Sequence, residues 1–192
     1  MADKYRLGML LFLASEAVFF TVLILAFVFY RGSPANAGGP SVFNALDVGR
    51  VAIFTACLYA SSFTIIMSER SHKKGKDGGM KLWLLLTIGL GAAFLFGEAT
   101  EYIDLTSRLG VTPNRDIFGT TFYALTGFHG FHVLIGLLLL TIMFILVMGG
   151  KFRGGAHPSA YNTVALYWHF VDVVWVVIFP TVYLWSLAGP VH

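Results

Sequence analysis

Hydrophobic residues fill five long stretches of the chain, and polar residues gather in the short segments between them. The apolar stretches cover residues 7–30, 48–68, 80–105, 117–148 and 161–187. Each reaches the roughly 20 residues that an α-helix needs to cross a bilayer. The pattern therefore predicts an all-α integral-membrane protein, with residues 1–192 forming a single domain of five transmembrane helices.

The composition supports a membrane protein and excludes other classes. Hydrophobic residues make up 57% of the 192 residues and charged residues only 12%, whereas an average soluble domain has roughly 25% charged residues. The net charge of +3 is small, and the cations are scattered among short loops. A nucleic-acid-binding face requires clustered positive charge, so we expect no nucleic-acid partner.

The distribution of the cations predicts the orientation of the bundle. If consecutive helices alternate in direction, one side of the membrane receives nine Lys and Arg residues and the other side four. By the positive-inside rule, the richer side is cytoplasmic, which places the N-terminus in the cytoplasm and the C-terminus outside. The nine are Lys4, Arg6, Arg70, Lys73, Lys74, Lys76, Lys81, Lys151 and Arg153, and the four are Arg31, Arg50, Arg108 and Arg115.

Ionisable side chains inside the apolar stretches are the candidate functional residues. Such groups are costly in hydrocarbon and usually face protein or water, so each is a functional candidate by default. The set consists of Glu16, Glu98, Glu101, His129, His132, His169 and Asp172.

Glu16 lies well inside the first apolar stretch, in "GMLLFLASEAVFF". At about 1.5 Å per residue it is roughly 13 Å into its helix. Removal from water favours the uncharged form of an acid, so we expect Glu16 to hold a proton. Two roles remain open at this point: an acid hydrogen-bonded to a neighbouring helix, or a site that binds and buffers protons.

The other candidates come in pairs spaced three residues apart, which places each pair on one helix face. These pairs are Glu98 with Glu101, His129 with His132, and His169 with Asp172. Acids and imidazoles on adjacent helices can satisfy one another as an interhelical polar network, and we favour this structural interpretation. Buried pairs of this kind are better evidence for helix registry than for stability.

The same histidines allow two cofactor hypotheses. A haem takes axial histidines from facing helices, and either His129 or His132 could pair with His169. A metal ion could instead use a glutamate with two or three of the histidines. The residues alone leave these alternatives open beside the polar network.

Three motifs resemble one known family. They are "GMLLFLASEAVFF", "TFYALTGFHGFHVLIG" and "YWHFVDVVWVVIFPTVYLW", in this order and at these separations. The chain resembles subunit III of the haem-copper respiratory oxidases, which comprise cytochrome c oxidases and quinol oxidases, and the likeness spans essentially the whole chain. The resemblance implies an accessory subunit packed directly against catalytic subunit I, beside subunit II and with bound phospholipid. Haem and copper are then expected in the partner subunits, with no cofactor or metal in this chain.

The resemblance also assigns roles to individual residues. His129, His132, His169, Asp172 and Trp175 fall on signature positions that are structural in the family. Glu16 matches an intramembrane glutamate that reacts with carbodiimide, and Glu101 with Tyr102 matches a Glu-Tyr pair. The chain departs from the family pattern in having Glu98 where Gln is expected. It also begins at the glutamate-bearing helix, as short bacterial members do, so the lipid cleft that longer members build with two further helices is expected to be absent or completed by another chain.

The functional hypothesis is therefore an accessory, non-catalytic subunit of a proton-pumping terminal oxidase in the bacterial cytoplasmic membrane. It implies support of proton uptake and of the durability of subunit I. One alternative is a subunit III-like partner of a quinol oxidase, a nitric oxide reductase or another respiratory assembly. A second alternative, from a different class, is an independent b-type haem protein or a small transporter.

Overall fold

The computed structural model describes residues 2–31, 46–110, 112 and 117–184. Five long helices account for nearly all of them, which confirms the predicted all-α class. The helices are α1 (Ala2–Arg31), α2 (Val48–Lys73), α3 (Asp77–Leu109), α4 (Ile117–Met148) and α5 (Pro158–Phe179). All five are long and apolar enough to cross a membrane.

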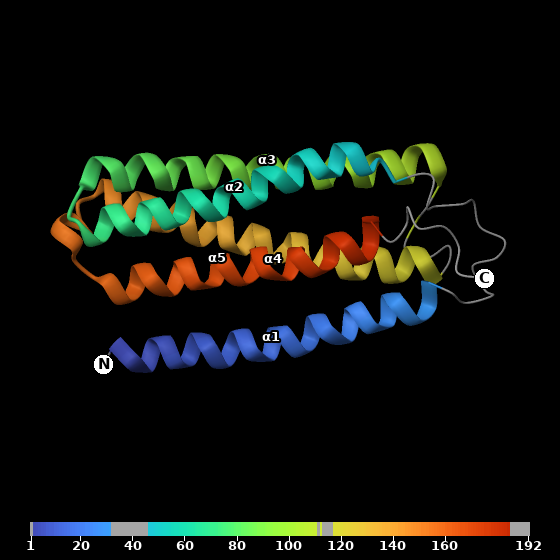
Figure 1. The fold of residues 1–192 in the computed structure, drawn as a ribbon, viewed down its shortest axis with the longest axis horizontal. Helices are drawn as coiled ribbons and strands as arrows, with labels where there is room; N and C mark the ends of the chain where they lie inside the picture. Colours follow the sequence, from blue (N-terminus) through green and yellow to red (C-terminus); the bar gives the residue numbers. More distant parts are fainter. Residues whose placement is uncertain (1, 32–45, 111, 113–116, 185–192) are drawn as a thin grey trace.

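The helices run up and down, side by side along one axis (Figure 1). α2 and α3 pack closely along their length, α4 and α5 lie against them, and α1 lies at the margin, where it contacts α4 and α5. The start of α1, the α2–α3 turn and the α4–α5 turn all lie at one end of the bundle (Figure 1). Because α5 ends at the opposite end, the alternating topology expected from the sequence is present.

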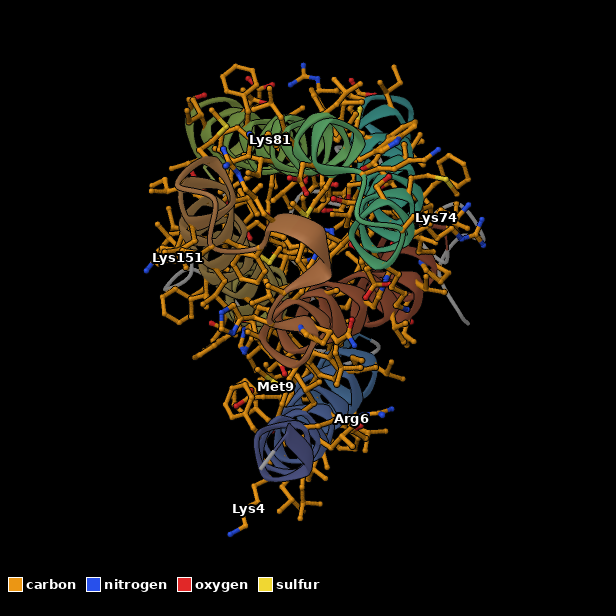
Figure 2. All side chains as sticks on the ribbon, turned by 90° about the vertical axis from the view of Figure 1, so that its left-hand side faces the viewer. Lys4, Arg6, Met9, Lys74, Lys81 and Lys151 are labelled. Atoms are coloured by element: carbon orange, nitrogen blue, oxygen red, sulfur yellow. The ribbon has the colours of Figure 1, made fainter. Side chains whose placement is uncertain are left out.

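The basic residues gather at the end that holds the start of α1. Figure 2 looks onto this end and shows Lys4, Arg6, Lys74, Lys81 and Lys151 around its rim. The grouping used for the predicted orientation is therefore present on this side of the molecule. On the opposite side, Arg115 lies outside the described residues, as do residues 185–187 of the predicted fifth stretch.

Helix ends follow local chemistry rather than hydropathy. The Asp47 side chain accepts a hydrogen bond from the Arg50 backbone N–H (3.0 Å) at the start of α2, as an N-cap residue does. Gly110 ends α3 with a φ of 59°, a left-handed conformation that glycine adopts without cost. Pro158 occupies the first turn of α5, where its missing N–H is not needed.

Pro180 changes the hydrogen-bonding pattern of the fifth helix, as its missing N–H predicts. The regular α-helix ends at Phe179, and residues Pro180–Leu184 continue as one π-helical turn. A proline cannot donate to the preceding turn, so the local ladder must rearrange. The rearranged turn places the Tyr183 side chain inside the bundle.

Tryptophans on α5 join it to α2 and to glycine-lined surfaces of its neighbours. Trp168 donates its indole N–H to Ser61 Oγ and Trp175 to Thr55 Oγ1, both at 3.0 Å. A Cβ atom added at Gly136 of α4 would lie only 2.7 Å from the Trp168 ring. Small residues and short hydroxyl contacts are the usual means by which helices associate in membranes.

Candidate functional site

The seven ionisable residues expected at membrane depth all project into or along the helix bundle. Glu98, Glu101, His129, His132 and Asp172 are buried, and Glu16 and His169 are half-buried. Burial of so many polar groups requires partners, because an unpaired polar group in an apolar interior is costly. The structure divides these residues among several small contacts instead of one continuous hydrogen-bonded chain.

Glu16 and His132 form a contact between α1 and α4. Glu16 Oε2 lies 3.2 Å from His132 Nε2. The other ring nitrogen, Nδ1, lies 2.7 Å from the backbone carbonyl oxygen of Phe128. His132 thus has a partner at each ring nitrogen. Nδ1 faces the preceding turn of α4, and Nε2 faces α1.

The two ring nitrogens of His132 face different kinds of partner. A carbonyl oxygen can only accept, so Nδ1 carries a hydrogen, and in a neutral imidazole Nε2 is then an acceptor. A carboxylate facing that acceptor would leave the contact without a hydrogen. A hydrogen bond between Glu16 and Nε2 therefore requires a further proton on one of the two groups.

Aromatic groups surround this pair on the bundle side. The Phe20 ring meets His132 edge-on with centroids 5.1 Å apart, and the Tyr167 hydroxyl donates to the His132 carbonyl oxygen at 3.2 Å. The side chain of Glu16 retains 21% exposure, compared with 9% for His132. Glu16 is therefore the more exposed member of the pair.

His129 lies one turn away from His132 and packs against aromatic rings. Its ring is fully buried and stacks on Trp175 with centroids 4.7 Å apart and planes inclined by 24°. Phe94 approaches it edge-on at 5.9 Å. Neither ring nitrogen has a hydrogen-bond partner in the described part of the chain.

Glu98 lies against the backbone of α4 at Gly130. A Cβ atom on Gly130 would be 2.6 Å from Glu98 Oε2, so a side chain at this position would force the carboxyl group to move. Tyr102 places its hydroxyl 3.1 Å from Glu98 Oε1 and 2.7 Å from Thr126 Oγ1. The "GFHG" stretch thus supplies the surface of α4 against which the Glu98 carboxyl group packs.

Glu101 is bound by the turn that follows Pro180. The Tyr183 hydroxyl donates to Glu101 Oε2 at 2.7 Å. Glu98 and Glu101 both line a small internal cavity beside Phe94 and Trp175. Within the described residues, Oε2 of Glu98 and Oε1 of Glu101 have no hydrogen-bond partner.

His169 and Asp172 share a helix but have different neighbours. Asp172 accepts a hydrogen bond from the Ser62 hydroxyl of α2. His169, one turn nearer the basic end, lines a polar cavity with residues of α1 and α2. The sequence places these two side chains on one helix face, but they contact different groups: Asp172 binds Ser62, and His169 lines the cavity.

The cofactor hypotheses can be compared with this arrangement. Across the described ranges, no three His, Cys, Asp or Glu side chains are grouped so that they could hold a metal ion. His129 packs its ring face on Trp175, and His132 uses both nitrogens on Phe128 and Glu16.

Several partners of the candidate residues were not anticipated from the sequence. They are neutral hydroxyl groups and a glycine, which hydropathy does not distinguish from ordinary packing residues: Ser62, Tyr102, Thr126, Gly130, Tyr167 and Tyr183. An ion pair between Arg50 and Asp104 (2.5 Å) at the less basic end was also missed. The spacing of Tyr102 four residues after Glu98 was the one available signal, because it places both on one helix face.

Comparison with known proteins identifies relatives along the whole described bundle. The family model "Cytochrome c oxidase subunit III" matches residues 1–187. Cytochrome c oxidase subunit 3 of Bacillus subtilis (strain 168) is 40% identical over 183 residues, which cover 95% of this chain and 87% of that protein. The subunit 3 of Synechocystis sp. is 36% identical over 183 residues, covering 95% of this chain and 76% of the relative.

A probable subunit 3 from Nocardia farcinica gives the same result, with 36% identity over 181 residues that cover 94% of this chain and 88% of the relative. The family model spans all five helices and the positions of the seven ionisable residues at membrane depth. In this five-helix bundle, Glu16 packs against the "GFHGFH" segment of α4. The comparisons show that the chain is a multi-pass membrane protein of the cytochrome c oxidase subunit III family, the accessory subunits of haem-copper oxidases.

Proposed function

We propose that this chain packs directly against catalytic subunit I, beside subunit II, in the inner membrane of a bacterium, where it sustains proton uptake and protects subunit I during turnover. In this proposal haem and copper belong to the partner subunits, this chain carries no redox centre, and bound phospholipid completes its surface. The basic end of the bundle faces the cytoplasm, as the nine cations on that side favour.

The observation that carries the proposal is the Glu16–His132 contact. In this proposal the contact holds a proton between Glu16 on α1 and the imidazole on α4, whose other nitrogen faces the carbonyl oxygen of Phe128. A carboxyl group that keeps its proton can transfer it to a carbodiimide nitrogen and then add through its oxygen to the central carbon, and Glu16 keeps one fifth of its side chain exposed. The contact therefore supports a role for Glu16 as a proton-holding, carbodiimide-reactive group at membrane depth.

The remaining polar contacts support a structural role. Glu98, Glu101 and Asp172 each bind a hydroxyl group of another residue, and His129 is enclosed by aromatic rings. Fully buried polar contacts of this kind set helix registry. In this proposal they hold α3, α4 and α5 in the arrangement that presents His132 to Glu16.

The decisive experiment compares the intact oxidase with Glu16→Gln and Glu16→Ala variants. We expect haem spectra and initial oxygen consumption near those of the unmodified complex, followed by faster loss of activity during turnover. Carbodiimide labelling of this subunit should disappear in both variants. A Ser15→Ala variant, altered at the exposed neighbouring position, serves as control; durability equal to wild type in both Glu16 variants would refute the role.

The absence of a redox centre is tested by separation of the subunits. Reduced-minus-oxidised spectra of the assembly and of the stripped chain should show haem and copper signals only in the fraction that holds the partners. A haem spectrum on the isolated chain would refute this part of the proposal and make His129, His132 and His169 ligand candidates again.

A further inference from the structure

The small internal cavity beside Glu98 and Glu101 lies between α2, α3 and α5. The centre of a water-sized sphere can move through about 10 Å³ of this space. A buried site needs roughly 10–15 Å³ on this measure to hold one water molecule, so the cavity has room for about one water and for no larger molecule. Its lining residues are Val51, Phe54, Phe94, Gly97, Glu98, Glu101 and Trp175.

Two carboxyl oxygens of the lining residues have hydrogen-bonding capacity that the described chain does not use. Glu98 and Glu101 are each only 7% exposed. One oxygen of each is bound, Glu98 Oε1 by the Tyr102 hydroxyl and Glu101 Oε2 by the Tyr183 hydroxyl. The other oxygens, Glu98 Oε2 and Glu101 Oε1, have no hydrogen-bond partner in the described part of the chain. Buried polar atoms nearly always bind protein or ordered water, because an unpaired one is costly.

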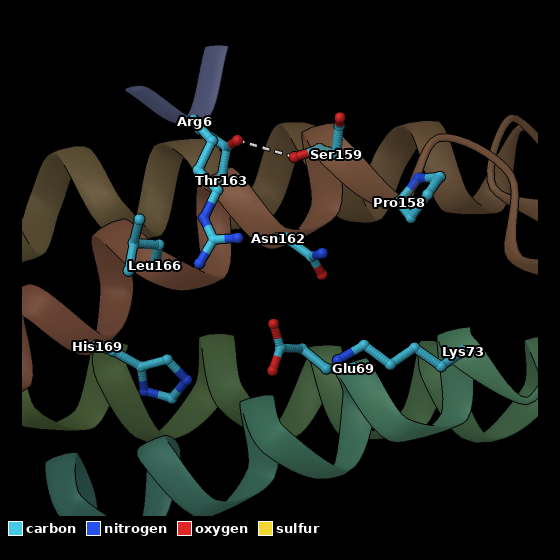
Figure 3. Close-up of a pocket in the computed structure, with 9 residues that line it drawn as sticks. All are labelled: Arg6, Glu69, Lys73, Pro158, Ser159, Asn162, Thr163, Leu166 and His169. Atoms are coloured by element: carbon cyan, nitrogen blue, oxygen red, sulfur yellow. Dashed lines mark hydrogen bonds between the residues drawn. The ribbon is translucent and has the colours of Figure 1, made fainter. Parts of the chain in front are cut away.

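The other walls of the cavity do not supply the missing partner. They are aromatic rings, an aliphatic side chain and a glycine, and the Trp175 indole N–H already donates to Thr55. The larger cavity at the basic end differs, because the cations Arg6 and Lys73 line it together with Glu69 (Figure 3). A carboxyl group there shares its cavity with positive charge, whereas the two in the small cavity share theirs with apolar side chains.

We propose that one water molecule binds in the small cavity and bridges Glu98 Oε2 and Glu101 Oε1. Residues three apart on a helix have Cβ atoms about 5–6 Å apart, and two hydrogen bonds of roughly 2.8 Å through one water span a comparable separation. The water can donate to both oxygens, or accept from a carboxylic acid and donate to the other group. The bridge therefore forms whether or not one of the acids holds a proton.

Water suits this cavity better than a metal cation does. A buried water is held by two to four polar partners, and the two carboxyl oxygens meet that requirement. Hard cations such as Ca²⁺ take six to eight oxygen ligands, which these largely apolar walls do not provide. The water acts as a structural component, because it completes the hydrogen bonding of the acid that packs on α4 and of the acid that binds the turn after Pro180.

The first test is a cryo-electron microscopy map of the intact oxidase complex that is sharp enough to show buried waters. We expect one peak within about 2.5–3.2 Å of Glu98 Oε2 and Glu101 Oε1. A direct hydrogen bond between the two carboxyl groups, a peak with the many oxygen neighbours of a metal ion, or no peak where other buried waters are visible would overturn the proposal.

Substitutions then test whether the two acids hold the water. Glu101→Leu keeps the approximate size of the side chain but removes one partner, so the peak should disappear. Tyr183→Phe is the matched control, because it removes a hydrogen bond to the same carboxyl group at the oxygen that does not bind the water. The peak should persist in this control. A peak that persists in Glu101→Leu, or one that is lost equally in Tyr183→Phe, would overturn the bridge.

A stability measurement on the complex gives an independent test. Val51→Ile adds a methyl group to the cavity wall and should displace the water. We expect the unfolding equilibrium constant to rise roughly tenfold more than in Val147→Ile, because a buried acceptor loses its partner. Val147 is equally well buried but does not line the cavity, so it calibrates the cost of the added methyl. Equal costs, or a stabilised Val51→Ile variant, would overturn the proposal.

These outcomes are separate from those of the proposed function. Neither Glu16 nor His132 lines the cavity, and both remain unchanged in all of these variants. Carbodiimide labelling and the position of haem in the assembly therefore report on the accessory role, and the map reports on the water.

Discussion

α1 and α5 are both apolar membrane helices, but the bundle holds them in very different ways. In the most apolar 18-residue stretch of each, 17% of residues are buried in α1 and 44% in α5. α5 inserts two tryptophans that donate hydrogen bonds to α2, whereas α1 lies at the margin and contacts α4 through Glu16. Hydropathy alone therefore says that a helix enters the membrane, and not how firmly it is held there.

The difference follows from how helices associate in lipid. Apolar side chains gain little from burial when the alternative solvent is hydrocarbon, so close packing and polar contacts decide. α5 has both: the Trp168 ring packs against glycines of neighbouring helices, and its indole N–H donates a hydrogen bond to a serine hydroxyl. α1 has large exposed residues such as Leu11 and Phe29, and depends on lipid or partner subunits to cover them.

The largest expected effect is on the packing of α5. Trp168→Ala removes a fully buried ring that fits against Gly91 and Gly136 and donates to Ser61. We expect a loss of about 3–5 kcal/mol of unfolding free energy, measured by denaturant titration in mixed micelles. Val173→Ala on the exposed face of the same helix should change stability little; equal losses would mean that α5 is not held by its buried face.

The next largest effect on stability is expected at Gly130 of α4, against which the Glu98 carboxyl group packs. Gly130→Ala places a methyl group 2.6 Å from the carboxyl oxygen, and overpacking of this kind costs roughly 1–3 kcal/mol. The double variant Gly130→Ala with Glu98→Ala should recover part of the loss, because the space is then open. Thermal unfolding of the three variants checks this, and the absence of any recovery would show that the clash lies elsewhere.

A smaller effect is expected for the contact between Glu16 and His132, which joins α1 to α4. A double-mutant cycle of Glu16→Gln and His132→Gln should give a coupling energy of about 1 kcal/mol, as for polar contacts between membrane helices. The readout is disulfide crosslinking between cysteines introduced on α1 and α4. Additive effects of the two substitutions would mean that other groups position α1.

The smallest effect is expected at Glu98 itself. Glu98→Gln keeps the size of the side chain and an acceptor for the Tyr102 hydroxyl. Because none of the ion pairs within the described ranges involves this carboxyl group, we expect a change within about 0.5 kcal/mol in the same unfolding assay. A loss of stability several times larger would indicate that the charge of Glu98 stabilises the packing of α3 against α4. An acid would then be as important there as Glu16 is for the packing of α1.

The sequence predicted the number and class of the elements well, for a simple reason. Crossing hydrocarbon requires about 20 apolar residues, so each span leaves a signal that is independent of its neighbours. The predicted ends were less accurate: α2 extends to Lys73 and α3 begins at Asp77, beyond the predicted limits of 68 and 80. Polar residues at a membrane surface continue a helix without contributing to the apolar signal.

The partners of the candidate residues could be predicted only in part. The sequence indicated that acids and histidines at membrane depth need partners, but the identity of each partner depends on how the helices are rotated. His169 and Asp172 are three residues apart, yet one lines a cavity and the other accepts from Ser62. Glycine and serine carry no hydropathy signal that marks them as neighbours of an acid.

The distance in sequence between Glu16 and His132 also has a consequence for how the protein is made. The two residues are 116 positions apart, and a ribosome adds roughly 5–20 residues per second. After Glu16 is synthesised, its partner is thus absent for roughly 6–23 s. During this interval the first helix lies in the insertion machinery or the lipid without His132, and the contacts that α1 makes with α4 and α5 can form only after those helices have been synthesised.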